Sequence, residues 1–163
     1  METIVFAGGC FWGVEAYFKQ INGIEDTLVG YIDGHKANPT YEEVCSGSGH
    51  AEAVKLTYDA QKVDLNTLLK HLFNIIDPTL YHRQGPDIGA QYRSGIYNYT
   101  QAQKAIIDGF IERVKKDYKK PLQLDFKTNL PFYEAEGYHQ DYLDKNPSGY
   151  CHVNLNSVNK IKG

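Results

Sequence analysis

Short apolar runs alternate along this chain with segments in which apolar residues recur every three or four positions. The apolar runs, and two stretches in which apolar and polar residues alternate, 54–58 and 122–126, predict strands, and the periodic segments predict helices. In chain order, we expect strands at residues 4–7, 27–32, 54–58, 96–99 and 122–126, and helices at residues 14–21, 65–76, 100–114 and 133–143. The resulting order, β-α-β-β-α-β-α-β-α, predicts an α+β fold: a two-layer α/β sandwich in which helices pack on a mixed sheet with ferredoxin-like topology.

Polar side chains mark where two of these helices begin. Asp64 is the expected N-terminal cap of the second helix, and Thr100 and Gln103 have the spacing of a capping box at the start of the third. The segments 34–49 and 77–94 are polar and rich in turn-forming residues, so we expect loops there. A long loop in a compact domain is often functional, which makes these two segments candidates for the site.

The bulk composition is that of an ordinary globular protein. Of 163 residues, 42% are hydrophobic and 23% are charged, and the formal net charge is −3. This length and mixture predict one domain over residues 1–163, with the residues from about 147 onward as a flexible tail. The slightly acidic charge argues against a nucleic-acid partner, and no apolar stretch approaches the ~20 residues that a membrane span needs.

Cysteine usage indicates the compartment and the cofactors. The three cysteines, Cys10, Cys45 and Cys151, are an odd number and do not suggest the disulfide framework of a secreted domain. The N-terminus lacks the basic and long apolar regions of a signal peptide, so we expect a cytoplasmic protein. His50 lies near Cys45, but no CxxC or HxxxH pair completes a set of four ligands, so we expect no metal and no other cofactor.

Cys10 stands between an expected strand with a Gly8–Gly9 turn and an expected helix. A thiol at the start of a helix lies near the positive end of the helix dipole, which favours the nucleophilic thiolate. The alternative is an inert core cysteine, because cysteine is among the most buried residue types. Phe11 and Trp12, the next two residues, either wall an apolar pocket or pack in the core.

Four further residues carry candidate chemistry, each with an ordinary structural alternative. Glu52 is a general acid if its surroundings are apolar enough to raise its pKa, and a solvated loop carboxylate otherwise. Asp87 and Tyr92, in the second long loop, are either polar pocket residues or turn and packing residues. Cys151 is either incidental or a mobile second thiol.

Several stretches together resemble one family. These are GCFW at 9–12, TYEEVCSG at 40–47, GHAEAV at 49–54, QGPDIGAQYRSG at 84–95, YHQDYL at 138–143 and GYC at 149–151. In matching order and over nearly the whole chain, they are similar to the A-type peptide methionine sulfoxide reductases. The resemblance implies a thiol-dependent oxidoreductase that reduces the S-epimer of methionine sulfoxide, free and in proteins, and so repairs oxidative damage.

The resemblance also assigns roles. It makes Cys10 the nucleophile, Glu52 the proton donor to the sulfoxide oxygen, and Cys151 the thiol that resolves the Cys10 sulfenic acid as a disulfide. Thioredoxin or a similar dithiol would then reduce that disulfide. In this assignment two aromatic side chains hold the methyl group, two tyrosines bind the oxygen and an aspartate orders the site: Phe11, Trp12, Tyr41, Tyr92 and Asp87. Cys45 matches a family segment without a catalytic role, and we expect a monomer.

The chain departs from the family pattern in its C-terminal cysteines, and residue chemistry leaves two other functions open. Many relatives carry two C-terminal cysteines, whereas this chain has Cys151 alone, so we expect the Cys10–Cys151 disulfide itself to face the reductant. Some relatives are fused to a B-type domain, so the polar C-terminal end is also compatible with the start of a linker. Residue chemistry alone leaves a cysteine hydrolase or acyltransferase with His50 or His139 as base, and a non-enzymatic redox sensor or peptide-binding module, as competing functions.

Overall fold

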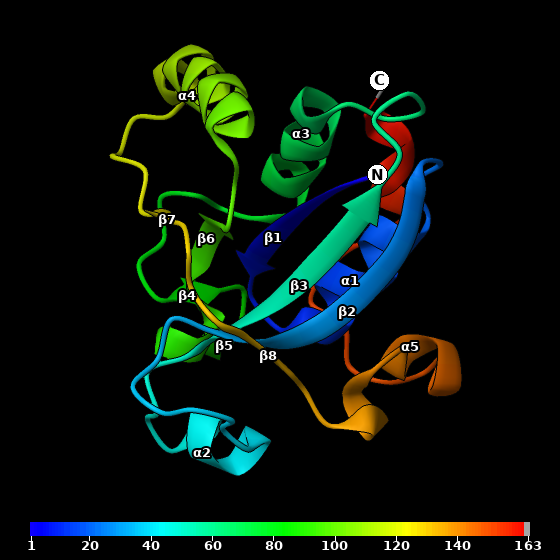
Figure 1. Cartoon of the computed structure of the whole chain (residues 1–163), viewed down its shortest axis with the longest axis vertical. Coiled ribbons are helices and arrows are strands. Elements are labelled where there is room, and N and C mark those ends of the chain that lie inside the picture. Colours follow the sequence, from blue (N-terminus) through cyan, green and yellow to red (C-terminus); the bar gives the residue numbers. More distant parts are fainter. Residues whose placement is uncertain (162–163) are drawn as a thin grey trace.

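The computed structural model describes residues 1–161, and its central feature is a curled six-stranded sheet (Figure 1). The strand order is β7-β6-β1-β3-β2-β8. Neighbouring strands pair antiparallel, except that β6 and β7 are parallel, so the predicted mixed sheet is confirmed. The strands are β1 (Glu2–Gly8), β2 (Ile24–Ile32), β3 (Ala51–Tyr58), β6 (Ser94–Tyr97), β7 (Asp125–Lys127) and β8 (Phe132–Glu134), with a separate hairpin of β4 (Arg83–Gln84) and β5 (Asp87–Ile88).

Helices of very different length join the strands. The α-helices are α1 (Phe11–Lys19), α2 (Tyr41–Cys45), α3 (Leu65–Ile75), α4 (Gln101–Val114) and α5 (Tyr142–Lys145), and single 3₁₀ segments occupy Ala90–Tyr92, Lys115–Asp117, Gly137–His139 and Leu155–Lys160. No helix within residues 1–161 is both long enough and apolar enough to cross a membrane.

The main core lies between one face of the sheet and three helices. Phe6 and Leu56 on this face share a buried cluster with residues of α1, α3 and α4, such as Val14, Leu68 and Phe110. The opposite face carries a smaller cluster without helix residues, which contains Val5, Ala7, Ile32, Ala51, Ala53 and Tyr97, with Leu130 and Phe132 packed against it. The expected packing of helices on a sheet is therefore confirmed, whereas the ferredoxin-like topology is not.

Two of the expected helix caps are confirmed, and a third cap reveals a helix that the sequence patterns did not predict. The Asp64 side chain accepts the Thr67 amide, and Thr100 forms the expected capping box. Thr40 and Glu43 form a second capping box at the start of α2, inside the predicted loop at 34–49. Because α2 is only five residues long, it is too short to show a helical period in the sequence.

Two predictions near the C-terminus are wrong in their extent. The strand predicted at 122–126 begins only at Asp125. The helix predicted at 133–143 is mostly absent, because residues 132–134 pair instead with the edge of β2, and the Ala135 amide donates to Val29 O. Asp141 then has a φ of 55°, which interrupts any helix before α5.

The C-terminal segment, red in Figure 1, packs against α1 and α3. Val153 belongs to the main core, and Leu155 and Val158 pack against that core. Asn74 of α3 donates hydrogen bonds to the carbonyl and hydroxyl oxygens of Ser157. The part of the tail up to residue 161 therefore shares the core of the rest of the chain, and the predicted flexibility of the tail stays a prediction.

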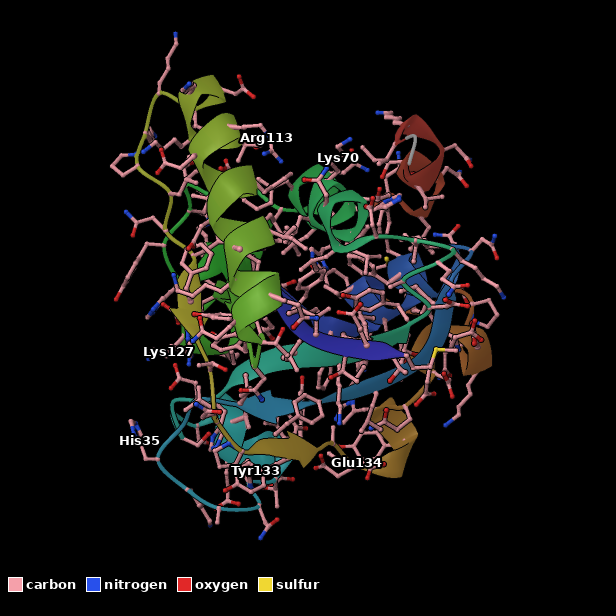
Figure 2. All side chains as sticks on the ribbon, turned by 45° about the horizontal axis from the view of Figure 1, so that its top comes forward. His35, Lys70, Arg113, Lys127, Tyr133 and Glu134 are labelled. Atoms are coloured by element: carbon pink, nitrogen blue, oxygen red, sulfur yellow. The ribbon has the colours of Figure 1, made fainter. Side chains whose placement is uncertain are left out.

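A cavity of about 670 Å³ lies between α3, α4 and the C-terminal 3₁₀ segment. Lys70 of α3 and Arg113 of α4 line it, and both stand on the opposite side of the molecule from Tyr133 and Glu134 of β8 (Figure 2). None of the candidate catalytic residues lines this cavity.

Candidate active site

Cys10 occupies the junction between β1 and α1. Gly9 has a φ of +91°, a conformation that favours glycine, and it turns the chain so that Cys10 becomes the N-terminal cap of α1. A Cβ atom added at Gly8 would lie 2.8 Å from a methyl carbon of Ile76, so the first glycine is required by close packing. The predicted strand, glycine turn and helix start are therefore confirmed around this thiol.

The thiol of Cys10 is protonated in the resting protein. Cys10 is 8% exposed. Burial raises its pKa, the nearby Glu52 carboxylate raises it further, and the backbone amide of Trp12 opposes them only in part. The expectation that the helix start favours the thiolate is wrong for this state, because the loss of solvation outweighs the helix terminus.

Glu52 is a buried acid held against the start of α1. It lies near the start of β3, is 1% exposed, and accepts a hydrogen bond of 3.1 Å from the Phe11 amide to its Oε1. Its Oε2 is buried and has no hydrogen-bond partner among residues 1–161. Burial raises the pKa of Glu52 to about 8, although the bond from Phe11 lowers it. The alternative of a solvated loop carboxylate is therefore wrong, and the group carries a proton at neutral pH.

Tyr41, Tyr92 and Asp87 gather around the same acid. Burial raises the pKa of both tyrosines, and the charge of Glu52 is the next cause in each case. The charge of Asp87 also raises the pKa of Tyr92 and of Cys10, and its carboxylate accepts a hydrogen bond of 2.8 Å from the Tyr150 hydroxyl. The two predicted hydroxyl groups and the predicted aspartate therefore lie within electrostatic reach of the acid, and both hydroxyls keep their protons.

The two aromatic residues after Cys10 have different surroundings. Trp12 is half-buried, stacks on Tyr142 with ring centroids 3.7 Å apart, and donates a hydrogen bond of 3.0 Å from Nε1 to Nδ1 of His139. Phe11 is 1% exposed and packs against Tyr31 and His139 in the core. Trp12 thus keeps part of its surface exposed, whereas the Phe11 side chain is enclosed by the core.

The segment after β8 holds this site through side chains to which the sequence patterns assigned no supporting role. Glu136 accepts hydrogen bonds from the Tyr31 hydroxyl at 2.8 Å and from the Tyr41 amide at 2.9 Å. The His139 ring packs against that of Tyr41 at a centroid distance of 4.5 Å, and Tyr142 stacks on Trp12. The density of aromatic and acidic residues in the sequence YEAEGYHQDY was the available signal, but the prediction of a helix placed them wrongly.

The C-terminal segment brings Cys151 to the first turns of α1. A Cβ atom added at Gly13 would lie 3.1 Å from Cys151 Sγ and 3.3 Å from Nδ1 of His152. The Cys151 thiol donates to Val153 O at 3.2 Å, and all three cysteines are free. Cys45 is exposed, at the end of α2. Of the two other thiols, Cys151 is thus the one that lies beside the helix that Cys10 caps.

The two histidines of the competing hydrolase hypothesis are engaged elsewhere. Nδ1 of His139 already accepts the Trp12 indole, and burial lowers the pKa of His139. His50 is hydrogen-bonded to the Ser48 hydroxyl and packs edge-on against Tyr133. In the described part of the chain, neither ring forms a hydrogen bond with Cys10. Neither His50 nor His139 therefore forms the thiol–imidazole pair with Cys10 that the hydrolase hypothesis needs.

Comparison with known proteins agrees with these features. A family model described as peptide methionine sulfoxide reductase matches residues 2–162. Proteins named peptide methionine sulfoxide reductase MsrA are 51% identical to this chain in Lachnoclostridium phytofermentans, over 93% of this chain and 92% of theirs, and 49% identical in Mycoplasma genitalium, over 94% and 98%.

Solved structures give the same result. Mxr1 from Saccharomyces cerevisiae in its reduced form is 35% identical, with a TM-score of 0.86 over 94% of this chain and 91% of that one. Methionine sulfoxide reductase A of Corynebacterium diphtheriae is also 35% identical, with a TM-score of 0.81 over 92% and 77%. This chain belongs to the peptide methionine sulfoxide reductase family.

Proposed function

We propose that this chain reduces the S-epimer of methionine sulfoxide, free and in proteins, to methionine. The observation that carries the proposal is the hydrogen bond from the Phe11 amide to Glu52, because it fixes a protonated, buried carboxyl group beside the residue that follows Cys10. A sulfoxide sulfur becomes electrophilic only when its oxygen is protonated or strongly hydrogen-bonded. A thiol and an acid that both hold protons at neutral pH suit that requirement.

In the proposed reaction, the sulfoxide oxygen faces Glu52 and the hydroxyls of Tyr41 and Tyr92, while the methyl group lies against Phe11 and Trp12. Glu52 gives its proton to the oxygen as the sulfur of Cys10 attacks, and the Cys10 thiol proton leaves to solvent or to the Glu52 carboxylate. The oxygen passes to Cys10, so that methionine is released and Cys10 becomes a sulfenic acid. Asp87 orders the site through its hydrogen bond with Tyr150.

Cys151 then attacks the sulfenic sulfur, and a Cys10–Cys151 disulfide and one water molecule are formed. The position of Cys151 beside Gly13 supports this role. Thioredoxin or a similar dithiol reduces the disulfide. Yeast Mxr1, which is 35% identical to this chain in its reduced form, has also been solved in complex with Trx2.

The proposal extends to the oligomeric state, domain organisation, cofactor requirement, location and topology of the protein. We propose a monomer in which residues 1–163 form a single catalytic domain that needs no cofactor, and a cytoplasmic location, which suits three free thiols. We also propose that β1, β2, β3 and β6, with α1 and α3, form a ferredoxin-like unit. The order β6-β1-β3-β2 and its antiparallel pairing support that topology.

Chiral analysis of sulfoxide reduction tests the proposed function. The protein is incubated with racemic free methionine sulfoxide and excess dithiothreitol, and the two epimers are separated over time. We expect the S-epimer to be consumed and the R-epimer to remain. Consumption of neither epimer, or preferential loss of the R-epimer, would contradict the proposal, and ester hydrolysis without any dithiol would favour the hydrolase.

A further inference from the structure

His152 lies across the glycine turn that carries Cys10. Its Nε2 is 3.0 Å from Gly8 O, and a Cβ atom added at Gly9 would meet Nε2 at 2.7 Å. At the other side of Cys10, a Cβ atom added at Gly13 would lie 3.3 Å from Nδ1 of the same ring. The imidazole therefore spans the backbone from Gly8 to Gly13.

The protonation of this ring follows from its one hydrogen bond. A carbonyl oxygen only accepts, so Nε2 carries the hydrogen and donates it to Gly8 O, and Nδ1 is left with a lone pair. Burial lowers the pKa of His152, which keeps the ring neutral at pH 7. Nδ1 is buried and has no hydrogen-bond partner among residues 1–161. The buried Nδ1 of His152 is thus a base without a hydrogen-bond partner in the described part of the chain.

That base points to the thiol of the neighbouring residue. Cys151 Sγ and His152 Nδ1 lie within 3.1 Å and 3.3 Å of the same point above Gly13, so the two atoms border one small space beside α1. In the resting state the Cys151 thiol donates to Val153 O. Rotation of the thiol away from that carbonyl frees its hydrogen for a base that borders the same space, and Nδ1 is a base there without a partner among residues 1–161.

We propose that His152 is the proton-transfer residue of the resolving step, an inference that rests on the proposed function. Nδ1 takes the proton of the Cys151 thiol as its sulfur attacks the Cys10 sulfenic acid, and the S–S bond forms as the S–O bond breaks. The imidazolium returns the proton to the departing hydroxide, which leaves as water. Atoms, electrons and charge balance, and no reactant beyond the two cysteines is needed.

The replacement His152→Gln separates this role from a structural one. The glutamine amide nitrogen reaches the place of Nε2 and still donates to Gly8 O, but an amide accepts no proton at neutral pH. His35→Gln is the matched control, because His35 is exposed in the loop after β2 (Figure 2). Thermal unfolding checks each protein, and His152→Asn carries the same expectation where the glutamine variant does not unfold cooperatively.

The experiment follows one turnover without reductant. Reduced protein is mixed with methionine S-sulfoxide and acid-quenched, and methionine and free thiols are counted. The first thiol disappears as methionine is released, and the second disappears as the disulfide forms. In His152→Gln we expect methionine release to be unchanged and loss of the second thiol to slow by roughly 10²-fold, the scale of a lost general base.

The pH dependence of disulfide formation distinguishes a proton-transfer role of His152 from a purely structural one. In the variant, the second step should accelerate about tenfold per pH unit, because only thiolate formed by solvent attacks, whereas the wild-type rate should change much less. Wild-type kinetics of the second step in His152→Gln would overturn the inference and leave Glu52 as the base. Slowing of methionine release to the same extent would also overturn it, and no methionine from the wild type would refute the proposed function itself.

Discussion

The Phe11 amide donates a hydrogen bond of 3.1 Å to Oε1 of Glu52, and this bond joins the first residue of α1 to the start of β3. It leaves Oε2 of the carboxyl group without a partner among residues 1–161. One oxygen is thereby fixed by the helix, and the other is a buried oxygen whose hydrogen-bonding capacity these residues leave unused. The acid, the nucleophile and the aromatic pocket are consequently held by a single short junction of the fold.

Replacement of Glu52 by glutamine separates the proton from the hydrogen bond. The amide oxygen of Glu52→Gln still accepts the Phe11 amide, but the side chain delivers no proton, so turnover should fall by roughly 10²-fold or more. Initial rates with excess dithiothreitol measure this change. Glu42→Gln, at an exposed position of α2, is the matched control and should keep wild-type turnover. An unchanged rate in Glu52→Gln at neutral pH would remove Glu52 from the mechanism.

The pH dependence of methionine release should also report the protonation of Glu52. The active form of Glu52 is the protonated one, and its pKa is raised to about 8, so the acid is present at neutral pH and is lost as the pH rises through that value. Because Cys10 must also lose its proton to attack, the rate constant of methionine release should rise with pH up to about 8 and level off above it, where loss of the Glu52 proton offsets further ionisation of the thiol. Single-turnover measurements isolate this step from reduction of the disulfide. A rate that keeps rising through pH 9 would show that thiolate formation, rather than the acid, controls the step.

The Trp12 side chain should contribute mainly to substrate capture. Trp12→Ala removes the exposed apolar surface and the stacking on Tyr142, so KM should rise by roughly tenfold or more, with a smaller loss in kcat. Trp12→Phe is the informative partner, because it keeps an aromatic ring but loses the hydrogen bond to His139, and it should be intermediate. Steady-state kinetics with free methionine sulfoxide give both constants. An unchanged KM in Trp12→Ala would exclude this residue from the pocket.

Replacement by alanine should have different effects on stability at two glycines that lie in helices, Gly109 and Gly13. A Cβ atom at Gly109 of α4 meets only the Arg113 side chain, at 3.5 Å, so Gly109→Ala should stabilise the protein by about 0.5–1 kcal/mol without loss of activity. At Gly13 the Cβ atom would meet Cys151 Sγ at 3.1 Å, so Gly13→Ala should displace the tail, lose that gain and slow disulfide formation. Denaturant unfolding and thiol counting measure the two effects. Equal stabilisation by both variants, with equally fast disulfide formation, would contradict the account.

Much of the fold could be predicted because its central elements have strong local signals. The strand at 4–7 is an apolar run, the strand at 54–58 alternates apolar and polar residues, and Asp64 and Thr100 cap their helices as their spacing predicts. The segment 132–145 could not be predicted, because its outcome depends on a contact distant in sequence. The free edge of β2 captures residues 132–134, and no local pattern indicates that edge.

The site was predictable in its residue types but not in its electrostatics. The resemblance supplied Cys10, Glu52 and Cys151, whereas the raised pKa of Cys10 depends on burial, which a sequence pattern does not measure. Glu136 escaped notice, and His139 was considered only as a hydrolase base, for the same reason, since their roles come from contacts with Tyr31, Tyr41 and Trp12. Residues that hold a site in place carry weaker sequence signals than residues that perform its chemistry.

Mass spectrometry of the reduced protein after one turnover tests the central claim most directly. The protein is treated with excess methionine S-sulfoxide in the absence of reductant, alkylated and digested. The account predicts one methionine released per chain and a Cys10–Cys151 disulfide, with Cys45 alkylated and Cys10→Ser inactive. A Cys10–Cys45 disulfide, or methionine release by well-folded Cys10→Ser, would contradict it.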